Sequence, residues 1–322
     1  MPDLRSLVKD HTGGSPMGGH KYVRRSLRHL SGDLDKQGHQ ACPNTVGRLL
    51  REQHFSPRAN VKRLTGGPCP DRDRQFRYIQ QLRKAFSQAG LPVLSIDAKK
   101  KELVGNFKNP GRAWREVPDL VNIYDFIHQA ICRATPYGLF DPQRNRALVC
   151  VGISADTAEF AVDCLDQWWR RQGRRAYPQA RKLLIMADGG GSNGHRPRLF
   201  KRALQQWADR HGVEVTVCHY PTGASKWNPV EHRLFGQISI NWAAQPLRTL
   251  DTMLACIRGT TTTTGLRVEA VLVPKTYARK IKVTDAEMKA LNIQRHRTCP
   301  DWNYTIHPRT TSVVSQSAKR IC

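Results

Sequence analysis

Two aspartates each follow a short apolar run, a position from which a carboxylate can do chemistry. Asp97 follows residues 92–96, and Asp188 follows residues 183–187. An apolar run of this length, bounded by charged residues or glycines, predicts a strand that is buried on both faces. Ligands of α/β sheets bind beyond the carboxyl ends of such strands. Both aspartates are therefore candidates for a binding or catalytic site.

A third carboxylate, Glu231, lies in the first turn of a predicted helix. Asn228 is a good N-cap residue, Pro229 suits the first helical position, and apolar residues follow at helical spacing. Asn228 and Glu231 also match a capping box, in which the glutamate only bonds back to the start of the helix. Asp188 taken alone also fits a turn residue at a strand end. Each acid by itself is open to a structural or a chemical interpretation.

The glycine-rich segment 189–194, GGGSNG, matches the G-x-G-x-x-G pattern of dinucleotide-binding loops. A nicotinamide-dependent oxidoreductase is therefore an alternative function. Two residues argue against it. Asp188 directly before the loop would repel a pyrophosphate, and the next predicted strand ends at His219, where the fingerprint requires an acid. We favour a loop whose glycines let a large ligand come close to the main chain.

The elements that must position these acids follow one another in a definite order. The patterns predict strand 92–97, strands 137–140 and 148–153, a helix that begins near Asp156, strand 183–187, helix 199–208, strand 213–218 and the helix that carries Glu231. Asp156 and Glu159 form a second capping box, and we assign both to helix capping. This order, with acids ending the first and fourth strands, predicts an α/β fold: an RNase H-like mixed sheet flanked by helices.

In such a fold Asp97, Asp188 and Glu231 converge on one point. Two strand-end acids on neighbouring strands and one acid from a helix then form a set of oxygen ligands. Hard divalent cations prefer such ligands and keep open positions for phosphate oxygens. The combination favours the chemical interpretation that no single acid could establish.

The first 86 residues predict an all-α helix-turn-helix segment that binds DNA. Residues 1–22 are rich in Gly, Pro and Ser and predict a loop. Apolar residues then recur at helical spacing over 26–37 and 43–53, with Gly38 between the two helices. The residues predicted to contact DNA in this segment are Arg48, Arg51, Lys62 and Arg63. A linking helix over 71–86 leads into the next domain.

Composition indicates a nucleic-acid partner. The chain has 322 residues, and its 52 Lys and Arg outnumber its 26 Asp and Glu, for a formal net charge of +26. An excess of this size implies a polyanionic partner. The nine cysteines are scattered singly, which argues against a disulfide framework or zinc ribbon. Without a signal peptide or membrane span, we expect a cytoplasmic protein.

We predict three segments. Residues 1–86 form the helix-turn-helix segment, residues 87–265 form the RNase H-like catalytic domain, and residues 266–322 form a basic C-terminal extension.

Long motifs give the chain a resemblance to a known family. These are SIDAKKKELVGNFKNPGRAW, PYGLFD, DTAEFAV, ADGGGSNG, HYPTGASKWNPVEHRLF and PDWNYTIHP. They resemble the ISAzo-type insertion-sequence DDE transposases, over about residues 7–308. Mapped residue by residue, the acidic triad of that family falls on Asp97, Asp188 and Glu231.

The resemblance implies a transposase that cleaves DNA and transfers strands with two bound Mg²⁺ ions, for which Mn²⁺ can substitute. The implied partners are double-stranded DNA, both element ends and target, and further copies of the chain assembled on that DNA. The expected location is the bacterial nucleoid. Residues near the implied site that we expect to contact DNA are Lys99, Lys100, His219, Lys226, Asn228 and His232.

The chain also departs from the family pattern near its start. Other members have a longer N-terminal part, so a truncated helix-turn-helix segment is expected, and residues 16–25 look altered. This departure supports an alternative function, a catalytically inactive or repurposed DNA-binding protein. The intact triad argues against that alternative.

Overall fold

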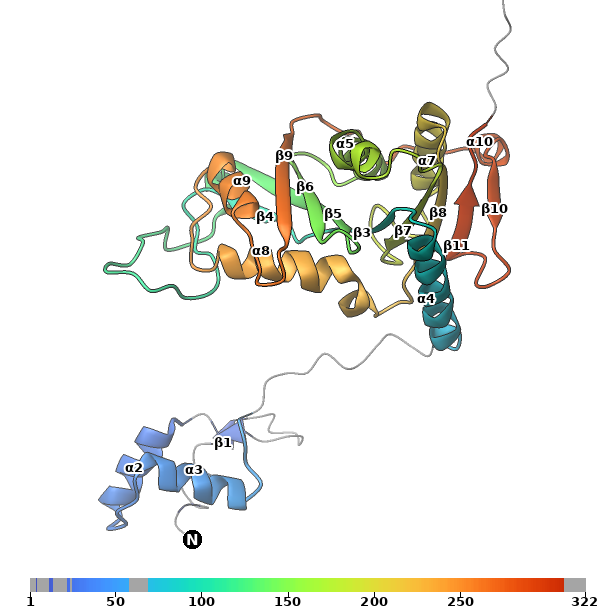
Figure 1. Cartoon of the computed structure of the whole chain (residues 1–322). Helices are drawn as coiled ribbons and strands as arrows, with labels where there is room; N and C mark the ends of the chain where they lie inside the picture. The colour runs from blue at the N-terminus through green and yellow to red at the C-terminus, as the bar shows by residue number, and fades with distance from the viewer. Residues whose placement is uncertain (1–3, 5–11, 14–21, 24, 58–68, 310–322) are drawn as a thin grey trace, which may run out of the picture. The chain divides into compact units, whose positions relative to one another are not determined.

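The computed structural model describes Leu4 and residues 12–13, 22–23, 25–57 and 69–309. Figure 1 shows the course of the chain. The chain divides into two compact units, residues 1–64 and residues 65–322.

The N-terminal unit contains the predicted helix pair. Helices α2 (Leu27–Lys36) and α3 (Pro43–Glu52) pack through buried Leu30, Leu34 and Val46. Gly38 between them has a positive φ of 83°, which favours glycine in the connecting turn. The unit is not purely helical, because β1 (Thr12–Gly13) pairs antiparallel with β2 (Tyr22–Val23).

The larger unit is built on one mixed sheet. Its strands are β3 (Val93–Ala98), β4 (Glu102–Val104), β5 (Cys132–Asp141), β6 (Arg146–Gly152), β7 (Lys182–Ala187), β8 (Glu214–His219), β9 (Arg267–Val273), β10 (Ile293–Arg295) and β11 (Asn303–Ile306). They lie in the order β10-β11-β8-β7-β3-β5-β6-β9, and β4 pairs with β5. Within the central part, β6-β5-β3-β7-β8, only β5 runs antiparallel to the other strands. This is the predicted RNase H-like arrangement.

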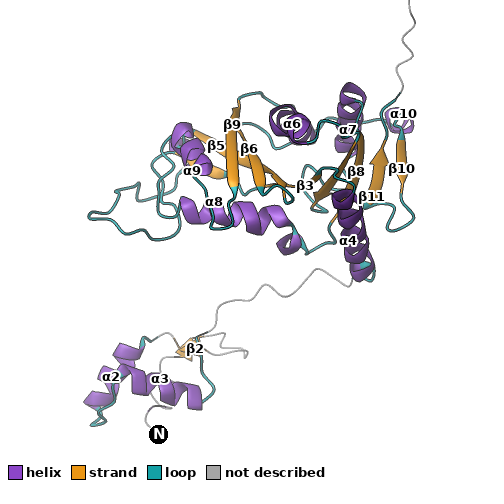
Figure 2. Ribbon diagram, viewed as in Figure 1, coloured by secondary structure: helices purple, strands orange, loops and turns teal. Residues whose placement is uncertain are grey.

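Helices cover both faces of this sheet (Figure 2). On one face α5 (Ala158–Trp168) and α7 (Arg198–His211) bury Trp168 and Trp207. The other face packs against α4 (Arg72–Gln88), α9 (Leu250–Arg258) and the continuous stretch of η4 (Glu231–Phe235) and α8 (Gly236–Asn241). The remaining short elements are η1 (Ile127–Gln129), η2 (Trp169–Gly173), α6 (Arg174–Ala176), η3 (Ser225–Trp227) and α10 (Asp285–Lys289).

Helix α4 belongs to the sheet and not to the N-terminal segment. Its buried Ile79 and Phe86 lie in one apolar cluster with Leu184 of β7. Its Gln75 side chain, fully buried, donates to the Asn303 side chain at 2.7 Å and to the His219 carbonyl at 2.9 Å. The predicted boundary at residue 86 therefore differs from the division that the structure shows.

The predicted C-terminal extension also contributes to the sheet. Strand β9 pairs parallel with β6, and β11 pairs antiparallel with β8. A boundary after residue 265 would separate these strands from their partners. Strands pair with partners that are distant in the sequence, so the local pattern of a short apolar segment does not reveal which strand it joins.

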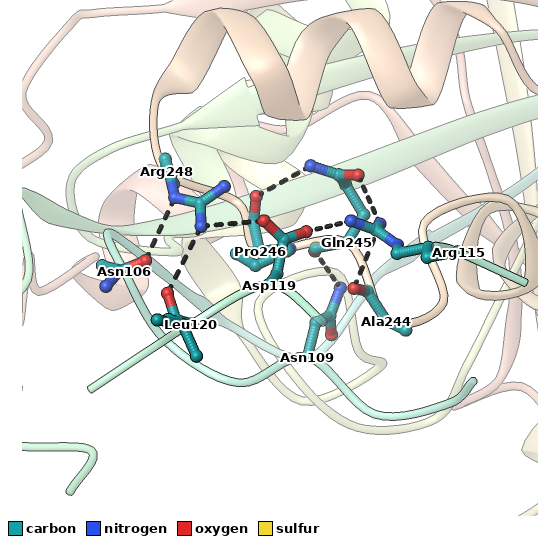
Figure 3. Close-up of polar contacts among 9 residues, drawn as sticks. All are labelled: Asn106, Asn109, Arg115, Asp119, Leu120, Ala244, Gln245, Pro246 and Arg248. Atoms are coloured by element: carbon teal, nitrogen blue, oxygen red, sulfur yellow. Dashed lines mark hydrogen bonds and ion pairs between the residues drawn. The ribbon is translucent and has the colours of Figure 1, made fainter. Parts of the chain in front are cut away.

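Between β4 and β5 the chain makes a long excursion whose base is held by polar contacts (Figure 3). Arg248 donates to the Asn106 side chain at 3.0 Å and to the Asp119 carboxylate at 3.1 Å. Arg115 also pairs with Asp119 and donates to the Gln245 side chain at 2.9 Å. These bonds fix the first part of the excursion against the residues that follow α8.

No helix in the described part of the chain is both long and apolar enough to span a bilayer.

Candidate active site

Strand register brings the first two acids together. Strands β3 and β7 are parallel neighbours, with Ile96 opposite Ala187. Asp97 and Asp188 each follow one member of that pair, so they lie side by side at the carboxyl ends of adjacent strands. Both residues are half-buried, and the Asp97 carboxylate accepts a hydrogen bond from the Ala98 amide at 2.8 Å.

Glu231 reaches the same point because η4 packs tightly on β5. Gly138 of β5 is the register partner of Asp97. A Cβ atom at Gly138 would lie 2.8 Å from the Phe235 ring and 2.9 Å from a Leu234 methyl group, so glycine is required for this close approach. The Glu231 carboxyl group then lies close enough to Asp97 and Asp188 to raise the pKa of both. Residues 231–235 form a π-helical turn, a feature that occurs frequently at functional sites.

Burial and nearby carboxyl groups raise the pKa values of the two aspartates. Burial raises the pKa of Asp97 to about 8, and the neighbouring Asp188 and Glu231 act in the same direction. Burial also raises the pKa of Asp188, and Glu231 adds to this effect. A group of acids that resists full ionisation is suited to binding positive charge.

Asn228 ties the three acid-bearing segments together. Its buried side-chain amide donates to the Asp188 carboxylate at 3.0 Å and to the Ile96 carbonyl at 3.3 Å. Its side-chain oxygen accepts from the Ser95 hydroxyl, which in turn accepts from the Val230 amide at 2.9 Å. The hydrogen bond from Asn228 also opposes the rise in the pKa of Asp188.

Two predictions about Asn228 are therefore wrong. It does not cap the helix with its side chain, and Glu231 does not complete a capping box with it, because the amide is used between β3 and β7. It also does not contact DNA, because it is fully buried. Its role is to orient Asp188 and the start of η4.

His219 is likewise buried and not available to DNA. Its Nδ1 donates to the Asp188 carbonyl at 3.0 Å, which fixes the neutral tautomer with the proton on Nδ1. Burial lowers the pKa of His219 to about 3. The predicted DNA contact is wrong, and the ring instead supports the main chain of Asp188.

The other residues predicted to contact DNA differ in how exposed their side chains are. Lys99 is held by Glu102 at 2.6 Å and lies over the Trp242 ring, so its charge is already partnered. Lys100, Lys226, His232, Arg48 and Arg51 are exposed. The His232 ring donates to the Lys226 carbonyl. Lys62 and Arg63 lie outside the described residues.

Sequence reasoning missed Asp156 as a residue of the site. Helix α5 is capped by Thr157, whose hydroxyl accepts from the Phe160 amide at 3.3 Å, and Glu159 pairs with Arg202 at 3.6 Å. The predicted capping box is therefore wrong. Asp156 instead lines a cavity of about 370 Å³ together with Asp97 and Asp188. The motif DTAEFAV carries Asp156, but its local pattern indicates only a helix start.

The glycine-rich loop follows β7 and borders two hollows. It lines the cavity with Asp156, and on its other side it lines a cavity of about 510 Å³ with His195 and Arg196. Gly191 has a positive φ of 76°, and a Cβ at Gly194 would lie 2.8 Å from the Gly189 carbonyl. The loop folds onto itself beside the Asp188 carboxylate, which would repel a pyrophosphate. This arrangement argues against the nicotinamide-dependent alternative.

The donor set fits a divalent cation by its chemistry. Asp97, Asp188 and Glu231 offer only carboxylate oxygens, the ligands that hard divalent cations prefer, and each of the two aspartates has its pKa raised by its acidic neighbours. In the ranges that the structure describes, no three His, Cys, Asp or Glu side chains are arranged so that they could hold a metal ion as they stand.

Comparison with known families identifies the chain. Residues 3–308 match the family model described as the Rhodopirellula transposase DDE domain. The chain belongs to this DDE transposase family. Membership agrees with the resemblance carried by the sequence motifs, and it makes the chain a DDE-type polynucleotidyl transferase.

Solved structures of another transposase are distantly similar. The Mos1 transposase paired-end complex with left transposon end is 15% identical, with a TM-score of 0.41, over 78% of this chain and 67% of that one. The pre-cleavage Mos1 transpososome is 14% identical, with a TM-score of 0.40, over 78% and 68% of the two chains. The Mos1 paired-end complex with Mg is 12% identical, with a TM-score of 0.40, over 78% and 67%. Among curated proteins no sequence matches the chain.

Proposed function

We propose that this transposase cleaves DNA and transfers the cut strand with Asp97, Asp188 and Glu231 as its catalytic carboxylates. The observation that carries the proposal is the meeting of three elements: the neighbouring ends of β3 and β7 bear Asp97 and Asp188, and the π-helical turn bears Glu231 close to both. The Asn228 side chain, which precedes this turn, donates to the Asp188 carboxylate at 3.0 Å. Phosphodiester cleavage by such a site depends on positioning and on charge neutralisation.

The three carboxylates would hold divalent cations, Mg²⁺ with Mn²⁺ as a substitute. Bound cations of this kind activate an attacking oxygen and stabilise a leaving oxygen. The chain's own contribution is to keep the three acids close together, in surroundings that raise the pKa values of Asp97 and Asp188. Asn228 orients Asp188 through the hydrogen bond from its side-chain amide.

A plasmid assay tests this function without knowledge of the element ends. We expect the purified protein to nick supercoiled plasmid with Mg²⁺ or Mn²⁺ and to lose this activity in EDTA. Asp188→Ala should lower the nicking rate by at least about 10²- to 10³-fold. The matched control is Asp251→Ala, which removes an exposed acid on α9. Nicking by Asp188→Ala at the parent rate would support the alternative of a DNA-binding protein without catalysis.

For DNA binding we propose a contribution from α3, where Arg48 and Arg51 are exposed beside an apolar helix pair. Arg48 pairs with Glu52 of the same helix at 2.9 Å, an exposed ion pair that a DNA phosphate would have to displace. The net charge of +26 supports an anionic partner. Replacing both arginines by Ala should weaken binding and lower the slope of log affinity against log salt by about 2. An unchanged slope would remove α3 from the interface. The DNA substrate would place the protein at the bacterial nucleoid, which a fluorescent fusion would report.

We also propose that copies of the chain associate on DNA through the excursion between β4 and β5. Several large apolar side chains are exposed there, among them Trp114, which is fully exposed, and Ile123 at 90%. An exposed apolar group of this kind favours a protein interface. The polar contacts of Arg248 hold the base of the excursion in place.

The association has a direct test in the mass of the protein–DNA complex measured by light scattering. Trp114→Ser with Ile123→Ser should reduce the complex to one protein copy per DNA. Leu272→Ser, at a 38% exposed apolar residue of β9, is the control and should leave the mass unchanged. Equal masses for the parent and the double variant would exclude the excursion as the interface.

A further inference from the structure

The cavity beside Asp97 and Asp188 has features that the three carboxylates do not explain. Its wall includes Asp156, Thr135 and Asn193. Thr135 and Asn193 are each 1% exposed. The Thr135 hydroxyl and the Asn193 side-chain NH₂ have no hydrogen-bond partner in the structure. Buried polar groups usually have partners, so two such groups in one cavity wall point to a ligand.

The charge around the cavity indicates the chemistry of that ligand. An amide NH₂ donates hydrogen bonds, and a hydroxyl can donate one. Residues 99–101 are lysines that also line the cavity. Lys99 is paired with Glu102, whereas Lys100 and Lys101 are exposed. Three carboxylates, Asp97, Asp156 and Asp188, line the same cavity and would repel a bare phosphate. The buried donors and the exposed lysines therefore suit a DNA phosphate only when cations held by Asp97 and Asp188 offset that negative charge.

The position of Asn193 depends on the glycine-rich loop, and this loop is tied to α5 by one side-chain contact. The Ser192 hydroxyl donates to the Asp156 carboxylate at 2.8 Å. The other contacts described within the loop are local, such as the Gly194 amide to the Gly191 carbonyl at 3.3 Å. Asp156 has no capping duty, because Thr157 caps α5. The Asp156 carboxylate can therefore hold loop 189–194 in place through its hydrogen bond with Ser192.

We propose that Asp156 is a positioning residue of the cleavage site. Through Ser192 it holds loop 189–194 so that Asn193 and Thr135 line a subsite for a DNA phosphodiester, next to the one cleaved at Asp97 and Asp188. This inference rests on the proposed function. In this role Asp156 acts as a hydrogen-bond acceptor, and its negative charge is secondary.

Four variants separate these roles. Asp156→Ala and Ser192→Ala each remove the hydrogen bond between these two side chains. The double variant removes the same single bond, so its effect should equal that of either alanine variant. Asp156→Asn keeps an acceptor oxygen for Ser192 but removes the negative charge. Hydrogen–deuterium exchange of residues 189–195 should rise in both alanine variants and recover in Asp156→Asn. Plasmid nicking should fall by about tenfold in each alanine variant, no further in the double variant, and by less in Asp156→Asn. Thermal unfolding of each variant controls for loss of the fold.

Three outcomes would overturn the inference. Unchanged loop exchange in Ser192→Ala would show that the hydrogen bond does not hold the loop. Asp156→Asn as impaired in nicking as Asp156→Ala, with normal loop exchange, would show that the charge matters and not the position. Additive losses in the double variant would show separate roles. If the parent protein shows the expected loop exchange but nicks no plasmid with Mg²⁺ or Mn²⁺, the proposed function fails and the subsite with it, whereas the loop anchor stands.

Discussion

Asp97→Asn is expected to abolish cleavage while making the metal-free protein more stable. The asparagine keeps the shape of the side chain but removes a carboxylate from the proposed catalytic set, so plasmid nicking should fall by at least about 10²- to 10³-fold. The stability gain arises because burial raises the pKa of Asp97 to about 8. Ionising this carboxyl group in the folded protein is therefore costly, and asparagine avoids the cost.

The same shift sets a pH dependence. In the unfolded chain an aspartate has a pKa of about 3.9. Between that value and the folded-state pKa of about 8, the folded protein binds more protons at Asp97 than the unfolded chain does. The free energy of unfolding therefore falls as pH rises through this interval. In EDTA, the melting temperature of the parent protein should drop from pH 5 to pH 8 more than that of Asp97→Asn. Parallel curves would contradict the burial of an uncompensated carboxyl group at this position.

Asn228→Ala is expected to have the second largest effect. The substitution removes the amide that joins the Asp188 carboxylate, the Ile96 carbonyl and the Ser95 hydroxyl. Asp188 then loses the hydrogen bond that lowers its pKa. Residues that orient catalytic or metal-binding groups change activity by about 10- to 100-fold when replaced, and we expect a loss of cleavage in that range.

Asn228→Asp sharpens the test. It retains oxygen acceptors but places a fourth carboxyl group against Asp188, so its cleavage loss should exceed that of Asn228→Ala and grow with pH. The control is Asn241→Ala, which removes an exposed asparagine of α8 that donates to the Cys256 carbonyl at 2.6 Å. If Asn228→Ala cleaves at the rate of this control, Asn228 has no orienting role.

Local pattern predicted the strands that carry the acids but not the contacts between them. The apolar runs before Asp97 and Asp188 predicted β3 and β7 within a residue or two, because strands buried on both faces are continuously apolar. That Glu231 belongs with these acids came from the order of elements and from the family resemblance. The π-helical turn and the close packing of Phe235 against Gly138 were not predictable, because Gly138 lies on a distant strand and the local pattern around Glu231 fits an ordinary helix.

The misassigned residues share one cause. Asn228, Asp156 and His219 sit at helix starts or a strand end, where a local explanation is available for a polar residue. In the folded chain their partners are far away in the sequence: Asp188 for Asn228 and His219, and Ser192 for Asp156. A capping pattern gives no information about a partner 30 to 40 residues distant.

The central claim is that Asp97, Asp188 and Glu231 act as one metal-dependent unit. The most direct measurement compares Mg²⁺-dependent plasmid nicking by the parent, the three single alanine variants and the triple variant. Groups that act as a unit lose nearly as much singly as together. We therefore expect each single variant to fall close to the triple variant, with every protein still binding DNA. A single variant that nicks at the parent rate, or losses that multiply in the triple variant, would contradict the claim.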